Sequence, residues 1–81
     1  MIIASMPIIK RFANCRVSIN PRDHNPPHFH VRMNDDREAW VAIATLEILH
    51  GKVFMREIAD VLDWAEANRA FLADKFEELQ Q

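Results

Sequence analysis

The chain has 81 residues, of which 49% are hydrophobic and 27% charged, so it has the composition of a globular protein and not of a disordered or low-complexity chain. This length leaves room for one hydrophobic core, and we therefore expect a single domain over residues 1–81. The net charge of -2 excludes a uniformly basic nucleic-acid binder. The charge is unevenly distributed, however. Residues 1–33 carry five Lys and Arg residues and one Asp (+4), whereas residues 34–81 carry five Lys and Arg residues and eleven acidic residues (-6).

Cysteine content and hydropathy indicate where the protein acts. Cys15 is the only cysteine, which excludes an internal disulfide and is typical of a reducing compartment. The opening MIIASMPIIKRF lacks the basic start of a signal peptide, and no run approaches the roughly 18 apolar residues of a membrane span. We expect a cytoplasmic protein without membrane association. Because so small a chain buries a limited share of its surface, a homodimer is a further expectation.

The first predicted elements form a β-hairpin. In residues 8–12 and again in 15–20, β-forming residues alternate with basic or polar ones, and Ala13 and Asn14 make a connection short enough for a hairpin. Residues 21–27 contain three prolines and cannot continue a ladder, so they should form a loop. A residue before proline is kept out of the helical region, so this loop should enter the next strand in an extended conformation.

The next predicted strand, residues 28–33, carries most of the motif HNPPHFHV. Side chains alternate along a strand, so the apolar residues should face the core and the basic residues the solvent-exposed face. The apolar set is Phe29, Val31 and Met33, and the exposed set is His28, His30 and Arg32.

The second half of the chain changes from strand to helix. A polar turn at 34–36 leads to a fourth strand over 39–46, and residues 47–53 predict a turn or a short strand end. Apolar residues then recur at three-and-four spacing, which predicts one helix, or two with a break near Asn68 as an N-cap. The expected fold is α+β: a three- or four-stranded antiparallel sheet over residues 6–53, packed against one or two helices over 55–79.

One interpretation of the histidines is catalytic. His28 and His30 would act as general acid and base, because imidazoles titrate near neutral pH. Arg32, together with Arg16 or Arg11, would hold a phosphate whose charge grows in the transition state. Ribonucleases that need no metal use this chemistry, so an RNA-cleaving or phosphate-transferring enzyme is one hypothesis.

Two other interpretations involve no catalysis by the rings. In one, His28 and His30 are ligands of zinc or another divalent metal, because residues i and i+2 on one strand face can converge on one ion. His24, Asp23 or Glu38 would then complete the site. In the other, the rings are structural and only stabilise the turn into the strand. The sequence leaves these alternatives open.

Most of the chain resembles a known family. The segments MPIIKRF, RVSI, DHNPPHFHV and EAWVAIATLEILHGKV, followed by a closing helix, resemble the small bacterial proteins of domain of unknown function family 4160, in which a hairpin precedes a P-P-H-x-H-V signature. In this resemblance Met6 matches the usual start, so residues 1–5 are an extension. The resemblance carries over His28 and His30, with His24 as a weaker match.

The same resemblance implies a partner. Members of the family are often encoded beside a second small protein, an arrangement similar to a toxin and antitoxin pair. It implies that this chain has a small cognate partner protein and is the toxin-like half, because it holds the candidate chemistry. The expected function is action on RNA or another phosphate-bearing target. The alternative is a non-catalytic interaction module that binds a partner protein through its sheet face, with or without a structural metal.

Overall fold

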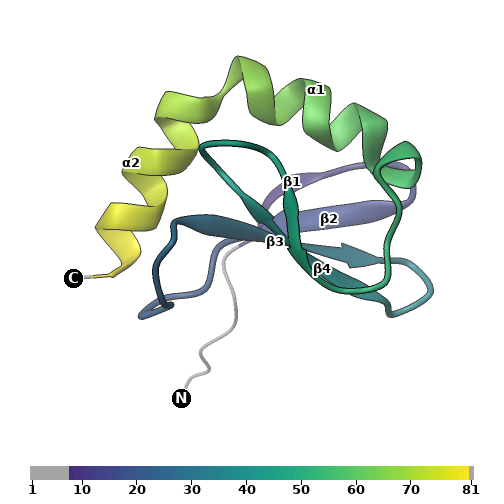
Figure 1. Cartoon of the computed structure of the whole chain (residues 1–81), viewed down its shortest axis with the longest axis horizontal. Coiled ribbons are helices and arrows are strands. Elements are labelled where there is room, and N and C mark those ends of the chain that lie inside the picture. The colour runs from purple at the N-terminus through teal and green to yellow at the C-terminus, as the bar shows by residue number, and fades with distance from the viewer. Residues whose placement is uncertain (1–7, 81) are drawn as a thin grey trace.

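The N-terminal part of the chain forms one antiparallel sheet. The computed structural model describes residues 8–80, so the expected extension over residues 1–5 lies outside the described part. Five strands pair in sequence order (Figure 1). They are β1 (Ile8–Arg11), β2 (Cys15–Ser18), β3 (His28–Met33), β4 (Glu38–Ala42) and β5 (Ile48–His50). The predicted hairpin of β1 and β2 is confirmed, and so is the α+β class.

Two details of the sheet differ from the sequence prediction. The sheet has five strands instead of three or four, because part of the segment 47–53 pairs with β4 as β5. The fourth strand ends at Ala42 and not at residue 46, because the chain turns back on itself there. The backbone amide of Leu46 donates to the carbonyl of Ala42 over 2.8 Å, and the amide of Ala42 donates to the carbonyl of Glu47 over 2.9 Å.

The C-terminal part is helical. A short 3-10 helix, η1 (Met55–Ile58), leads into α1 (Ala59–Ala67), which is followed by α2 (Arg69–Leu79). Of the two alternatives, the structure has two helices with a break at Asn68, although this residue does not act as a side-chain N-cap. Its side-chain Nδ2 instead donates to the carbonyl of Trp64 over 2.8 Å, which satisfies a carbonyl near the end of α1. Within residues 8–80, no helix is long and apolar enough to cross a membrane.

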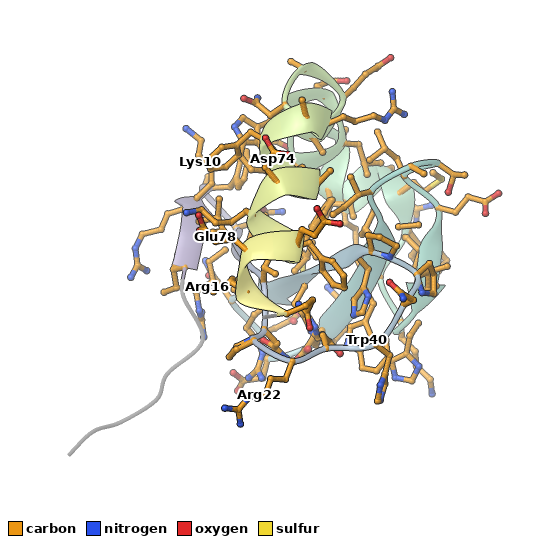
Figure 2. All side chains as sticks on the ribbon, turned by 90° about the vertical axis from the view of Figure 1, so that its left-hand side faces the viewer. Lys10, Arg16, Arg22, Trp40, Asp74 and Glu78 are labelled. Atoms are coloured by element: carbon orange, nitrogen blue, oxygen red, sulfur yellow. The ribbon has the colours of Figure 1, made fainter. Side chains whose placement is uncertain are left out.

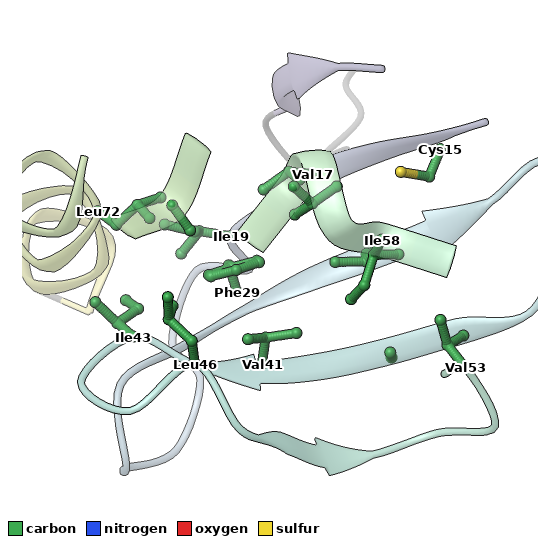
Figure 3. Packing of buried hydrophobic residues seen from close by; sticks show 14 of the residues in the cluster. Cys15, Val17, Ile19, Phe29, Val41, Ile43, Leu46, Val53, Ile58 and Leu72 are labelled. Atoms are coloured by element: carbon green, nitrogen blue, oxygen red, sulfur yellow. The ribbon is translucent and has the colours of Figure 1, made fainter. Parts of the chain in front are cut away.

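The core lies between the sheet and the helices, which cover one face of the sheet (Figures 1 and 3). The prediction for the apolar set of β3 is confirmed, because Phe29 and Val31 are fully buried and Met33 is nearly so. Phe29 packs in the same cluster as Ile58 and Leu72 (Figure 3). Burying one such side chain stabilises the fold by about 1.5–3 kcal/mol. The apolar face of the sheet is therefore held against the helices, and the opposite face is the one that remains for function.

Candidate functional site

The sheet face opposite the helices carries a row of arginines. We call this face the outer face. In the ladders, Arg11 of β1 lies opposite Arg16 of β2, and Arg16 lies opposite Arg32 of β3. Directly opposed residues of antiparallel strands project from the same face, so these three side chains, the arginine row, cross the sheet side by side. Arg32 in turn lies opposite Glu38 of β4, and its guanidinium donates to Glu38 Oε1 over 3.0 Å.

Aromatic rings lie next to the arginine row on the outer face. In the neighbouring row of the ladders, His30 lies opposite Trp40, and Trp40 lies opposite His50. The ring centroids of Trp40 and His50 are 4.7 Å apart, and those of Trp40 and His28 are 5.4 Å apart with nearly parallel planes. Trp40 is half-buried and points away from α1 at the lower side of the molecule (Figure 2), whereas His50 is exposed.

The two histidines of β3 are buried, so the expectation that they face solvent is wrong. His28 and His30 are each 3% exposed. The cause is the proline loop, residues 21–27, which folds over this end of the outer face. Its two ends are held by backbone bonds: the Arg22 amide donates to the carbonyl of Leu79 over 3.2 Å, and the Ile43 amide donates to that of Pro27 over 3.0 Å. Strand alternation predicts the face of a side chain but not what covers that face.

His30 lies between two carboxylates. Its Nδ1 is 2.7 Å from Glu38 Oε2, and its Nε2 is 2.8 Å from Asp23 Oδ2. Glu38 also binds two further side chains on this face. The indole N–H of Trp40 donates to Glu38 Oε2 over 3.2 Å, and the guanidinium of Arg32 donates to Glu38 Oε1. This network therefore holds the His30 ring in one orientation.

His28 is held by the backbone of the proline loop. Its Nδ1 donates to the carbonyl of Pro26 over 2.8 Å. Its Nε2 lies 3.0 Å from Asp23 Oδ2, but the direction is not that of a hydrogen bond, so this nitrogen is buried without a hydrogen-bond partner among the described residues. On the other side, the ring contacts Phe76 of α2, with centroids 5.8 Å apart.

Both carboxylates beside His30 have a lowered pKa. Burial raises the pKa of Asp23, but the hydrogen bonds from His30 and from the backbone amide of His24 outweigh it and bring the pKa below its ordinary value. For Glu38, burial also raises the pKa, and the hydrogen bonds from His30, Trp40 and Arg32 outweigh it. Both groups are therefore negatively charged at neutral pH.

The structure brings together most of the residues that the sequence singled out. His28, His30 and Arg32 project from one face of β3, as the alternation predicted, but the rings are enclosed and Arg32 is paired with Glu38. His24 does not join the other histidines. It is exposed, and Asp23 takes the position beside the rings. Which of two neighbouring loop residues turns inward depends on the path of the loop, and the sequence carries no signal for it.

The comparisons with known proteins identify one family. A family model described as "Domain of unknown function (DUF4160)" matches residues 15–77, which is more than three quarters of the chain. The matched segment contains β2 to β5, the proline loop, α1 and most of α2. No curated protein and no solved structure matches the chain.

Proposed function

This chain belongs to the DUF4160 family, and from that premise we propose that it is an RNA-binding protein that holds single-stranded RNA on the outer face of its sheet. In this proposal it is the toxin-like half of a two-component module with a small cognate partner protein. The observation that carries the proposal is the arginine row, with Arg11 opposite Arg16 and Arg16 opposite Arg32.

The arginine row is costly for the fold and useful for binding an anion. Like charges directly opposite each other on neighbouring strands destabilise a sheet. Glu38 compensates only Arg32, and none of the ion pairs among residues 8–80 involves Arg11 or Arg16. Neighbouring guanidinium groups with free donors bind phosphate oxygens in pairs, which makes arginine the preferred residue for nucleic-acid backbones. A phosphate backbone therefore supplies the charge that the sheet lacks.

The aromatic rings beside the row favour RNA over a simple anion. The exposed ring of His50 rests on Trp40, 4.7 Å away between centroids. Single-stranded RNA is held by stacking its bases on such rings, which contributes about 1–3 kcal/mol per base. A strand of RNA that crosses the outer face would therefore meet guanidinium groups for its phosphates and rings for its bases.

The helical side of the molecule has the opposite charge. Asp74 and Glu78 lie on α2, whereas Arg16 and Arg22 come from the sheet and the proline loop (Figure 2). The low net charge of the chain thus results from two faces of different sign and does not argue against a local basic surface. RNA would be attracted to the outer face and repelled from the helices.

The proposal concerns binding, and cleavage by His28, His30 and Arg32 stays an untested hypothesis from the sequence. The geometry gives cleavage less support, because a phosphate at these rings would lie beside the carboxylates of Asp23 and Glu38. Gel analysis of RNA incubated with the purified protein tests this point. We expect intact RNA; cleavage that is lost in a folded His30→Ala variant would establish the catalytic interpretation instead.

The binding proposal is tested by fluorescence polarisation with a labelled single-stranded RNA at several salt concentrations. Arg11→Gln and Arg16→Gln should each weaken binding about 3- to 10-fold and lower the salt slope by about one phosphate contact. Arg56→Gln is the matched control, because it makes the same charge change on η1, away from the sheet. Equal affinities for the outer-face variants and this control would refute the proposal.

A further inference from the structure

A second group of side chains, distinct from the arginine row, converges beneath the proline loop. One ligand-type atom from each of Asp23, His28 and His30 lies within 4.8 Å of the others. Asp23 Oδ2 is 3.0 Å from the Nε2 of His28 and 2.8 Å from the Nε2 of His30. The rings are buried, and the Asp23 side chain is 13% exposed. The three atoms therefore share one small, nearly closed space.

The hydrogen bonds on the far side of each ring determine what the rings present to this space. His28 Nδ1 faces the carbonyl of Pro26, which can only accept, so this nitrogen carries the hydrogen. His30 Nδ1 faces Glu38, which Arg32 holds as a carboxylate, so this nitrogen also carries the hydrogen. The second nitrogen of each ring, Nε2, lies on the side of Asp23: that of His30 is hydrogen-bonded to Asp23 Oδ2 over 2.8 Å, and that of His28 lies 3.0 Å from the same oxygen without a hydrogen bond.

A proton on His30 Nε2 can bridge His30 and Asp23, but it leaves the buried Nε2 of His28 without a hydrogen-bond partner among the described residues. Burying a polar atom without a partner is unfavourable. A positive ion bound by all three atoms would give this nitrogen a partner.

We propose that Asp23, His28 and His30 form a site for a divalent transition metal ion, with Zn²⁺ as the best match. Imidazole nitrogen and carboxylate oxygen are ordinary Zn²⁺ ligands, and three protein ligands leave a fourth position open. In zinc sites the second ring nitrogen usually donates to a carboxylate or a backbone carbonyl, which is the arrangement that Glu38 and Pro26 provide.

Binding an ion requires an adjustment of the spacing. Tetrahedral bonds of about 2.0–2.1 Å place ligand atoms about 3.4 Å apart, so Asp23 Oδ2 would move away from the two nitrogens by about half an ångström. The two nitrogens, which lie within 4.8 Å of each other, would adopt the same spacing. Asp23 belongs to the proline loop and not to the sheet, so it can make this shift without disturbing the strands. His24 is not part of the site, because it is exposed and only its backbone amide contacts Asp23, over 3.0 Å.

A cavity borders the proposed site on the side of Asp23. Asp23 also lines a cavity of about 370 Å³ between the proline loop and α2, with Phe76 and Glu77 on the opposite wall. This space has room for a water molecule as the fourth ligand. The bound ion would connect the proline loop to β3 and so stabilise the part of the outer face next to Trp40.

The test uses the full chain, purified without metal and titrated with Zn²⁺ alone by calorimetry. We expect one equivalent to bind per chain and the melting temperature to rise. Asp23→Asn should weaken binding at least tenfold, and Glu38→Gln, which changes the orientation of His30, should weaken it about 10- to 100-fold. His24→Ala and His50→Ala are the controls, because both rings are exposed and lie outside the three-residue set, and both variants should bind as the wild type does.

Folding must be separated from metal binding. Variants of His28 and His30 remove buried rings and can fail to fold, so Asp23→Asn in the loop is the decisive variant, with circular dichroism to show that it is folded. Absence of Zn²⁺ binding by the folded wild type would overturn the proposal, and so would equal affinities of Asp23→Asn and His24→Ala. Neither result bears on RNA binding by Arg11 and Arg16, which use other atoms.

Discussion

Arg16 lies directly opposite Arg32 in the ladder between β2 and β3, so two guanidinium side chains leave the outer face from neighbouring strands. A sheet gains nothing from this pairing. Favourable cross-strand pairs stabilise a sheet by roughly 0.2–1 kcal/mol each, and like charges directly opposite each other destabilise it by a comparable amount. The pairing is better understood as a feature that serves binding at a small cost in stability.

The first prediction follows from that cost. Arg16→Thr places a β-forming residue without charge opposite Arg32 and should raise the free energy of unfolding by about 0.2–1 kcal/mol. The same change should weaken RNA binding. Urea unfolding and fluorescence polarisation on the same preparation check both effects. A variant that is less stable than the wild type would show that Arg16 supports the fold.

The second prediction concerns Glu57 and acid stability. The hydrogen bonds from Arg37, at 3.0 and 2.7 Å, and from the backbone amide of Phe54, at 2.9 Å, lower the pKa of Glu57 from 4.5 to about 2. Because the folded pKa lies below the unfolded one, the stabilisation is complete above about pH 4.5 and is lost as the pH falls toward 2.

Urea unfolding between pH 2 and 6 measures this effect. The wild type should lose stability as the pH falls through that range, and Glu57→Gln should be less stable at pH 6 with a flatter pH dependence. Glu66→Gln on α1 is the control, because none of the ion pairs among the described residues involves Glu66. A Glu57→Gln curve parallel to that of the wild type would contradict the prediction.

The third prediction concerns Gly51, which follows β5. Its φ of +108° is one that side-chain-bearing residues rarely adopt, and a Cβ atom there would overlap the carbonyl oxygen of Glu38. Gly51→Ala should therefore lower the free energy of unfolding by about 1–3 kcal/mol, since both the backbone and the contact are strained. Lys52→Ala, at the exposed next position, should have little effect. Thermal melts of the two variants distinguish them.

The fourth prediction compares two phenylalanines. Phe29 is fully buried at the centre of the sheet, whereas Phe54 is 61% exposed. Phe29→Ala should cost about 3–5 kcal/mol, because it removes a core side chain and leaves a cavity. That is a large part of the roughly 5–15 kcal/mol that stabilises a small domain. Phe54→Ala should lower the free energy of unfolding much less. Denaturant unfolding of the two variants checks this, and equal losses of stability in both would argue against the observed core.

Local patterns were sufficient for much of the fold. The alternation in β3 predicted that Phe29 and Val31 enter the core, and the three-and-four spacing after residue 55 predicted the helical region but left one helix or two open. Strand and helix periods depend on neighbours in sequence, so they can be read from sequence. The end of β4 was predicted wrongly because a continuous apolar run contains no signal for the reversal after Ala42.

The candidate site was only partly predictable for a related reason. The sequence by itself determined the α+β class and placed His28, His30 and Arg32 on one face, because side-chain direction in a strand follows from the backbone. Only the tertiary structure decided that the proline loop buries the rings, that Asp23 and not His24 lies beside them, and that Arg11 and Arg16 extend the row across the sheet. Loop paths and strand register depend on contacts between residues far apart in the chain, and the pattern of neighbouring residues does not contain them.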